Sequence, residues 1–95
     1  MVTRVQRIEA ALRRLFAPAE LAVIDDSHRH AGHSGHRPEG ETHYTVLVVS
    51  QAFRGQSRVA RSRAVHEALA AEFGDGLHAL SLTLRTPEEH SRNPN

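Results

Sequence analysis

Cysteine, tryptophan and lysine are all missing from this 95-residue chain. Without cysteine the chain can form no disulfide, offers no thiolate nucleophile and supplies no sulfur ligand to a metal. Its 12 basic residues are all arginines, and 11 acidic residues leave a net charge of +1 with neutral histidines. A total charge this small is not typical of a nucleic-acid-binding protein.

Long hydrophobic runs are also missing. No apolar stretch approaches the roughly 20 residues that a membrane span needs, and the first residues lack the pattern of a secretory signal. We therefore expect a cytoplasmic protein that does not enter a membrane. The length fits one domain, which we place at residues 1–90, followed by a disordered tail at residues 91–95.

The first half of the chain predicts one helix and two strands. Apolar residues recur with helical spacing over residues 3–16, where Thr3 and Gln6 fit a capping box. The short apolar stretch 21–24 and the stretch 42–49, which is rich in strand-forming residues, both predict strands. Between these strands the sequence is polar and contains glycine and proline, which indicates a long loop.

The second half predicts a helix, a strand and a short final helix. Ser57 can cap a helix that carries Val65, Leu69 and Phe73 on one face and stops at the glycines of residues 74–76. Apolar residues alternate over residues 78–84, and the Thr-Pro-Glu-Glu sequence at 86–89 is typical of a helix start.

The element order α-β-β-α-β-α predicts an α+β fold. A helical crossover makes the second and third strands parallel if they are neighbours, whereas the first two strands can pair antiparallel. We therefore expect a three-stranded mixed sheet with the helices packed on it.

Histidines are concentrated in the expected loop and directly after it. Five of the eight fall within sixteen residues, namely His28, His30, His33, His36 and His43. Neutral imidazole is the commonest metal ligand in proteins, but this spacing matches no closed zinc motif. The cluster alone therefore leaves open a ligand role, a zinc or nickel site built from the loop, and a polar loop without a metal.

His78 begins the third expected strand with the same parity as Leu80, which predicts that its side chain points toward the core face. A single histidine in this position is usually a structural, hydrogen-bonded edge residue. However, the starts of two parallel strands can lie together, which would bring His78 near the end of the histidine loop.

Basic residues surround the start of the second long helix without an acidic residue between them. They are Arg54, Arg58, Arg61 and Arg63. Together with the helix N-terminus they could bind an anion or a nucleic acid. The near-neutral total charge favours the alternative, a solvated basic face.

The order and spacing of several motifs resemble the BolA family along nearly the full length of the chain. These motifs cover residues 24–30, 40–44, 48–50, 53–57, 65–69, 77–82 and 86–89. The resemblance implies a fold related to the class II KH arrangement and a non-enzymatic role beside a monothiol glutaredoxin.

In such a complex the two proteins share a [2Fe-2S] cluster. The glutaredoxin and glutathione supply sulfur, while the BolA-like chain supplies a histidine at the start of its third strand and a histidine or cysteine from the loop. The resemblance assigns these roles to His78 and to His30, with His33 and His36 as alternatives for the loop ligand. We expect the free chain to be a monomer or a weak homodimer.

The sequence departs from the family pattern in the second long helix. BolA-like chains usually carry Arg-His-Arg there, whereas this chain has Ser62 between two arginines. The departure affects a helix surface rather than the expected ligands. BolA-like proteins have also been regarded as DNA-binding transcriptional regulators, and a DNA contact through the surface from Arg54 to Arg63 is our second hypothesis.

Overall fold

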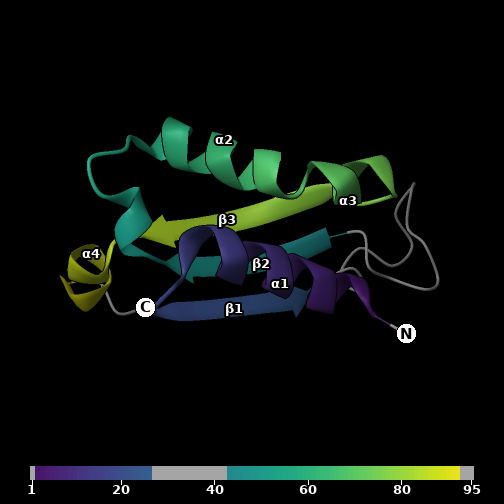
Figure 1. Cartoon of the computed structure of the whole chain (residues 1–95), viewed down its shortest axis with the longest axis horizontal. Helices are drawn as coiled ribbons and strands as arrows, with labels where there is room; N and C mark the ends of the chain where they lie inside the picture. Colours follow the sequence, from purple (N-terminus) through teal and green to yellow (C-terminus); the bar gives the residue numbers. More distant parts are fainter. Residues whose placement is uncertain (1, 27–42, 93–95) are drawn as a thin grey trace.

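The computed structural model describes residues 2–26 and 43–92, which form a three-stranded sheet and its helices (Figure 1). The elements are α1 (Arg4–Phe16), β1 (Glu20–Asp25), β2 (His43–Val49), η2 (Gln51–Phe53), α2 (Arg58–Ala68), α3 (Ala70–Gly74), β3 (Ala79–Arg85) and α4 (Pro87–Arg92). In these two ranges no helix has the length and apolar character needed to cross a membrane.

The sheet has the order β1-β2-β3 and is mixed, as predicted. β1 runs antiparallel to β2, with Ile24 opposite Thr45. β3 runs parallel to β2, with Tyr44 opposite Leu80. The crossover through α2 and α3 therefore joins two adjacent parallel strands, and β2 is the central strand.

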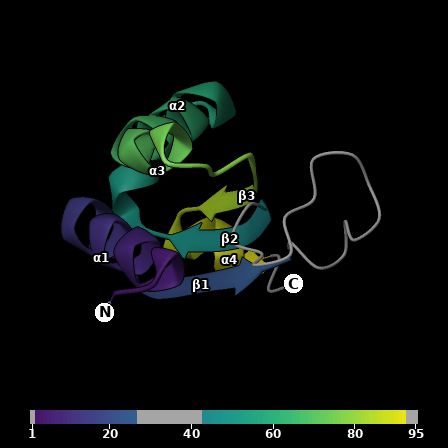
Figure 2. The same cartoon turned by 90° about the vertical axis from the view of Figure 1, so that its right-hand side faces the viewer.

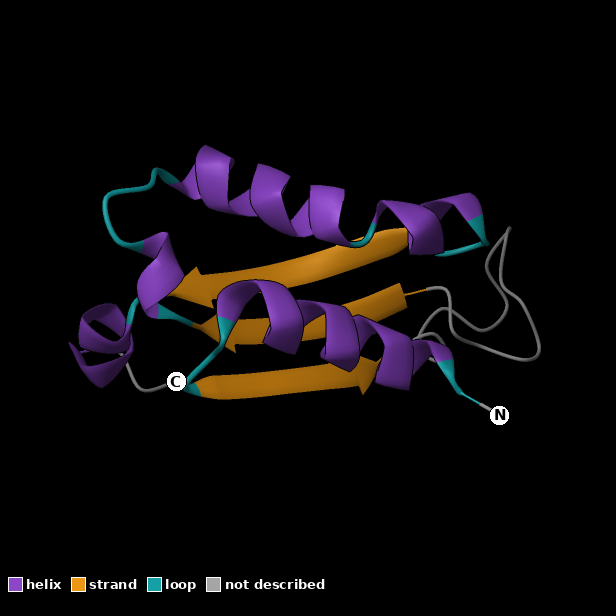
Figure 3. Cartoon of the chain, viewed as in Figure 1, coloured by secondary structure: helices purple, strands orange, loops and turns teal. Residues whose placement is uncertain are grey.

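The helices α1, α2 and α3 cover one face of the sheet, whereas α4 lies at the end where β3 finishes (Figures 1 and 2). Figure 3 shows this separation of helices and strands by colour. The hydrophobic core lies between these two layers and contains Ile8, Leu12, Tyr44, Val46, Val48, Phe53, Val65, Leu69 and Leu77. The alternating residues of β2 supply three of these side chains, because every second residue of a strand faces the same side.

The predicted helix start at Thr3 is confirmed. The Thr3 hydroxyl accepts a hydrogen bond from the Gln6 amide, and the Gln6 side chain accepts one from the Thr3 amide. This capping box begins α1, whose fully buried residues are Ile8 and Leu12. The helix ends at Phe16, before Pro18, as expected.

The helix predicted from Ser57 to residue 73 begins as expected but is divided in two. The Ser57 hydroxyl accepts a hydrogen bond from the Ala60 amide, so the cap is confirmed. At Leu69 the backbone leaves the helical region, with φ −109° and ψ 17°, and α3 starts one residue later. A spacing of four residues between apolar side chains does not reveal such a break, because Leu69 remains buried in the core.

α4 begins with the predicted cap and ends later than expected. The Thr86 hydroxyl accepts a hydrogen bond from the Glu89 amide, and the Glu89 carboxylate accepts one from the Thr86 amide. The helix continues to Arg92, so Ser91 and Arg92 are helical rather than part of a disordered tail. Residues 93–95 lie outside the described ranges.

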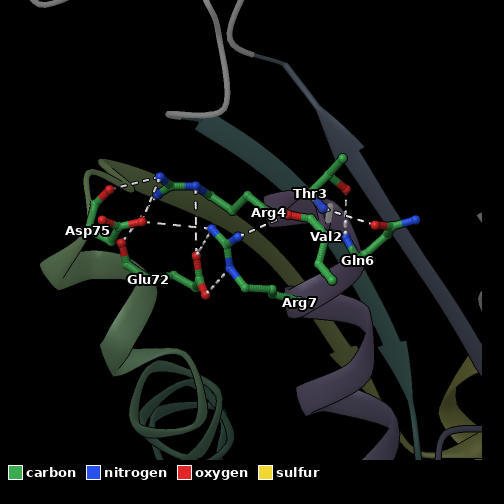
Figure 4. Close-up of polar contacts among 7 residues, drawn as sticks. All are labelled: Val2, Thr3, Arg4, Gln6, Arg7, Glu72 and Asp75. Carbon is green, nitrogen blue, oxygen red and sulfur yellow. Dashed lines mark hydrogen bonds and ion pairs between the residues drawn. The ribbon is translucent and has the colours of Figure 1, made fainter.

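Charged side chains join the start of α1 to α3 (Figure 4). Arg7 makes two hydrogen bonds to the Glu72 carboxylate, of 2.9 and 3.0 Å. Arg4 donates to the main-chain oxygens of Glu72 and Asp75. Because α3 follows the break at Leu69, these contacts hold the end of the crossover against α1.

Candidate functional site

His78 lies directly before β3 and is exposed. It precedes the first residue of the strand, Ala79, so its side chain is not buried in the core. Leu77 is the residue of this turn that enters the core, with 4% of its surface exposed. Gly76, with φ 110°, precedes it and supplies the left-handed conformation that the turn requires.

The ring of His78 stacks on that of His43. Their centroids are 5.8 Å apart and their planes differ by 19°. This contact follows from the parallel pairing of β2 and β3, which places His43 opposite Ala79. The expected proximity between His78 and the end of the histidine-rich segment is therefore confirmed at His43.

The two described residues that flank segment 27–42 lie beside each other. The Asp26 amide donates to the His43 carbonyl oxygen at 2.9 Å, and the Thr45 hydroxyl donates to the Asp26 carboxylate. Asp26 is buried, with 9% of its surface exposed. The segment therefore leaves and re-enters the sheet next to the two stacked histidines, whereas His28, His30, His33 and His36 lie outside the described residues.

The donor groups at this end of the sheet include the imidazole nitrogens of His43 and His78 and the Asp26 carboxylate. Among the described residues, no group of three or more histidine, cysteine, aspartate or glutamate side chains could hold a metal ion. The exposed His78 ring can offer a nitrogen to a metal centre whose other ligands come from elsewhere.

The arginine surface is smaller than predicted, because Arg61 is buried. Only 8% of its surface is exposed, and its guanidinium makes two hydrogen bonds to Glu89, of 2.6 and 3.1 Å. It also donates to the main-chain oxygens of Gln56 and Leu84. Arg61 is therefore a structural residue and not part of the candidate nucleic-acid surface.

Arg54 is engaged as well, since it forms an ion pair with Glu88 on the surface. Arg58 and Arg63 are exposed and form no ion pair with another described residue. The candidate basic surface therefore consists of Arg58 and Arg63, with Arg54 held in its ion pair with Glu88.

The arginines lower the pKa values of the two glutamates of α4, Glu88 and Glu89. The hydrogen bonds from Arg61, followed by that from the Thr86 amide, lower the pKa of Glu89 to about 2. Arg54 likewise lowers the pKa of Glu88. The sequence between the arginines does not reveal these two carboxylates, because they come from α4, which follows the end of β3. The capping box at Thr86 was a usable signal for an ordered helix there.

The fold and these side chains define a small α+β domain that presents histidines at one end of a mixed sheet. A family model described as "BolA-like protein" matches residues 12–89. The chain belongs to the BolA-like family, which confirms the resemblance.

Curated relatives cover nearly all of this chain. It is 46% identical over 88 residues to the "Uncharacterized protein in cobS 5'region" of Sinorhizobium sp., a match that spans 92% of this chain and 95% of the relative. It is 43% identical over 91 residues to "SufE-like protein 1, chloroplastic/mitochondrial" of Arabidopsis thaliana. That match covers 92% of this chain and 24% of the relative, so the chain spans about a quarter of that protein.

A third relative carries a functional name. The "DNA-binding transcriptional regulator BolA" of Escherichia coli is 38% identical over 84 residues, which cover 88% of this chain and 76% of the relative. Among solved structures, the "BolA domain of SufE1 from Arabidopsis thaliana" matches with a TM-score of 0.83 and 43% identity. The match covers 94% of this chain and 98% of that domain, which confirms the fold class.

Proposed function

We propose that this chain is a cytoplasmic, non-enzymatic accessory protein that binds a monothiol glutaredoxin and provides His78 as a ligand to a shared [2Fe-2S] cluster. Its role would lie in cluster trafficking or in iron and redox regulation. The observation that carries the proposal is the exposed His78 ring, stacked on His43 at the point where segment 27–42 leaves and re-enters the sheet.

The chemistry of the chain supports a shared site. A chain without cysteine can contribute to an iron–sulfur centre only through other ligands, and two histidines serve in this way in Rieske centres. The missing thiolates would come from the glutaredoxin and glutathione. His30 is the proposed second ligand, with His33 and His36 as alternatives on the same segment.

Anaerobic reconstitution with a monothiol glutaredoxin and glutathione tests this proposal. Visible absorption and circular dichroism of the mixed complex are compared for the wild type, His78→Ala and His30→Ala. We expect both substitutions to change the cluster spectrum. His66→Ala is the matched control, because His66 is an exposed histidine on α2 whose ring nitrogen already contacts the Ser62 carbonyl at 2.9 Å.

The control should leave the spectrum unchanged. If His78→Ala and His30→Ala give the wild-type spectrum, the ligand assignment is wrong. If the wild-type chain forms no mixed complex although its far-ultraviolet circular dichroism shows that it is folded, glutaredoxin is rejected as the partner.

A second candidate function is DNA binding by a transcriptional regulator, and the name of the Escherichia coli relative favours it. The exposed residues Arg58 and Arg63 would provide the phosphate contacts. Each neutralised phosphate contributes a slope of about −0.9 to the dependence of log K on log salt, so two contacts give about −1.8. Titration of labelled DNA at several salt concentrations, with Arg58→Gln and Arg63→Gln, tests this candidate. Salt-independent or absent binding would reject it.

A further inference from the structure

A groove of about 680 Å³ runs between the start of α2 and the outer edge of β3. Arg58, Arg61 and Ser62 line it on the helix side, and Leu82 and Leu84 line it on the strand side. Figures 1 and 2 both show α2 running alongside β3. No other described strand pairs with β3 on this side, because β3 is the last strand of the sheet.

Two hydrogen bonds establish which backbone groups of β3 face the groove. The Ser50 amide donates to the Arg85 carbonyl at 2.9 Å, so this carbonyl points inward to the end of β2. Carbonyl directions alternate along a strand, and the Leu84 carbonyl therefore points outward. Arg61 confirms this direction by donating to the Leu84 oxygen at 3.2 Å.

Leu80 and Leu82 have the same parity as Leu84, so their amide and carbonyl groups also point to the outer edge. Such a row of donors and acceptors is a template for another strand. Arg61 occupies only one position of the row, at Leu84. The rest of the row remains available to a polypeptide backbone.

The groove carries an excess of positive charge. Three arginines, Arg58, Arg61 and Arg85, line it together with a single carboxylate, that of Glu89. The Glu89 carboxylate is already bound by Arg61. Arg58 lies on the helix side of the strand edge, whereas Arg85 has the opposite parity to Leu84 and lies toward the other face of the sheet.

We propose that this groove binds an extended, acidic polypeptide segment of a partner protein, which pairs with the edge of β3 from Leu80 to Leu84 as a fourth strand. Addition of a strand to an exposed edge is an established mode of peptide recognition. Acidic side chains on the face of the segment that turns toward α2 would reach Arg58, because every second residue of a strand lies on the same face. A single-stranded nucleic acid fits less well, because its phosphates only accept hydrogen bonds and its bases do not repeat the donors and acceptors of the strand edge at the spacing of a second backbone.

The test uses the isolated full chain and a blocked heptapeptide in which valine and glutamate alternate. Amide chemical shifts are recorded during titration with this peptide and with a control peptide that has lysine in place of glutamate. We expect saturable shifts at Leu80, Leu82 and Leu84 with the acidic peptide only. Arg58→Glu should weaken binding at least tenfold, and its position in the first turn of α2 is compatible with an acidic residue.

Arg63→Glu is the matched control, because Arg63 is exposed on the same helix but does not line the groove. It should change the affinity by less than twofold. The proposal is overturned if no β3 amide shifts, if both variants weaken binding equally, or if the lysine peptide binds as well. It is also overturned if a ten-residue oligothymidylate shifts these amides and the acidic peptide does not. No glutaredoxin is present, so the result is independent of the proposed cluster function.

Discussion

Arg61 and Glu89 form a bidentate ion pair between α2 and α4, with nitrogen–oxygen distances of 2.6 and 3.1 Å. The same guanidinium donates to the main-chain oxygens of Gln56 and Leu84, and it lies 5.8 Å from the centre of the Phe53 ring. One side chain thus connects the turn before α2, the edge of β3 and the final helix.

Replacement of Arg61 by methionine should destabilise the fold by about 2–3 kcal/mol. It removes four hydrogen bonds and leaves two main-chain oxygens and one carboxylate without this donor. The midpoint of thermal unfolding should fall by roughly 10 °C or more. Arg63→Met is the control and should change stability by less than about 0.5 kcal/mol, because Arg63 is exposed. Equal effects of the two substitutions would contradict the structural role of Arg61.

The Arg61–Glu89 pair should also make stability depend on pH in the acidic range. The pKa of Glu89 is about 2 in the folded chain, below its ordinary value of 4.5. The carboxylate therefore contributes its full stabilisation above pH 4.5, and this contribution is lost as the pH falls toward 2. Urea unfolding of the wild type and of Glu89→Gln should differ most near pH 6 and converge near pH 2. A constant difference across this range would mean that the carboxylate is not held by Arg61.

The pair formed by Arg7 and Glu72 should show measurable coupling in a double-mutant cycle. Arg7→Met, Glu72→Gln and the double variant should give a coupling free energy of about 0.5–1 kcal/mol. Glu72 is mostly buried, with 12% of its side chain exposed, and Arg7 binds it with two hydrogen bonds. The Arg54–Glu88 pair is about half exposed on both sides and should couple more weakly. A larger coupling free energy for Arg54–Glu88 than for Arg7–Glu72 would show that burial does not determine the strength of these ion pairs.

A thiolate in place of the proposed ligand should retain the cluster but change its reduction potential. Histidine ligands raise the potential of a [2Fe-2S] centre relative to cysteine ligands. His78→Cys in complex with the glutaredoxin should therefore lower the potential by on the order of 100 mV. Spectroelectrochemical titration gives this value directly. His66→Cys is the control and should leave it unchanged, and an unchanged value in His78→Cys would show that residue 78 does not bind iron.

Much of the fold could be predicted because local signals and topology agree. The capping residues Thr3, Ser57 and Thr86 each mark a helix start that the structure confirms. The mixed sheet followed from the helical crossover. The break at Leu69 could not be predicted, since a single residue outside the helical region does not alter the apolar spacing of the helix.

The site was less predictable because it depends on contacts between distant segments. Parallel pairing correctly suggested that His78 lies near the start of β2, but not that Leu77 would take the buried position and leave His78 exposed. The arginine surface was overestimated for a similar reason. Its partners Glu88 and Glu89 come from α4, and only the folded arrangement places them against Arg54 and Arg61.

The hydrogen bond from Asp26 to His43 has a consequence for how BolA-like chains can diversify. It joins the two described residues that flank residues 27–42 through backbone atoms alone. The entropy of closing a loop grows only with the logarithm of its length, so a doubling costs about 0.6 kcal/mol. Insertions, deletions and exchanges of residues are therefore inexpensive at this position. Under the proposed function, exchanges within residues 27–42 would change the second ligand while His78 keeps its place directly before β3.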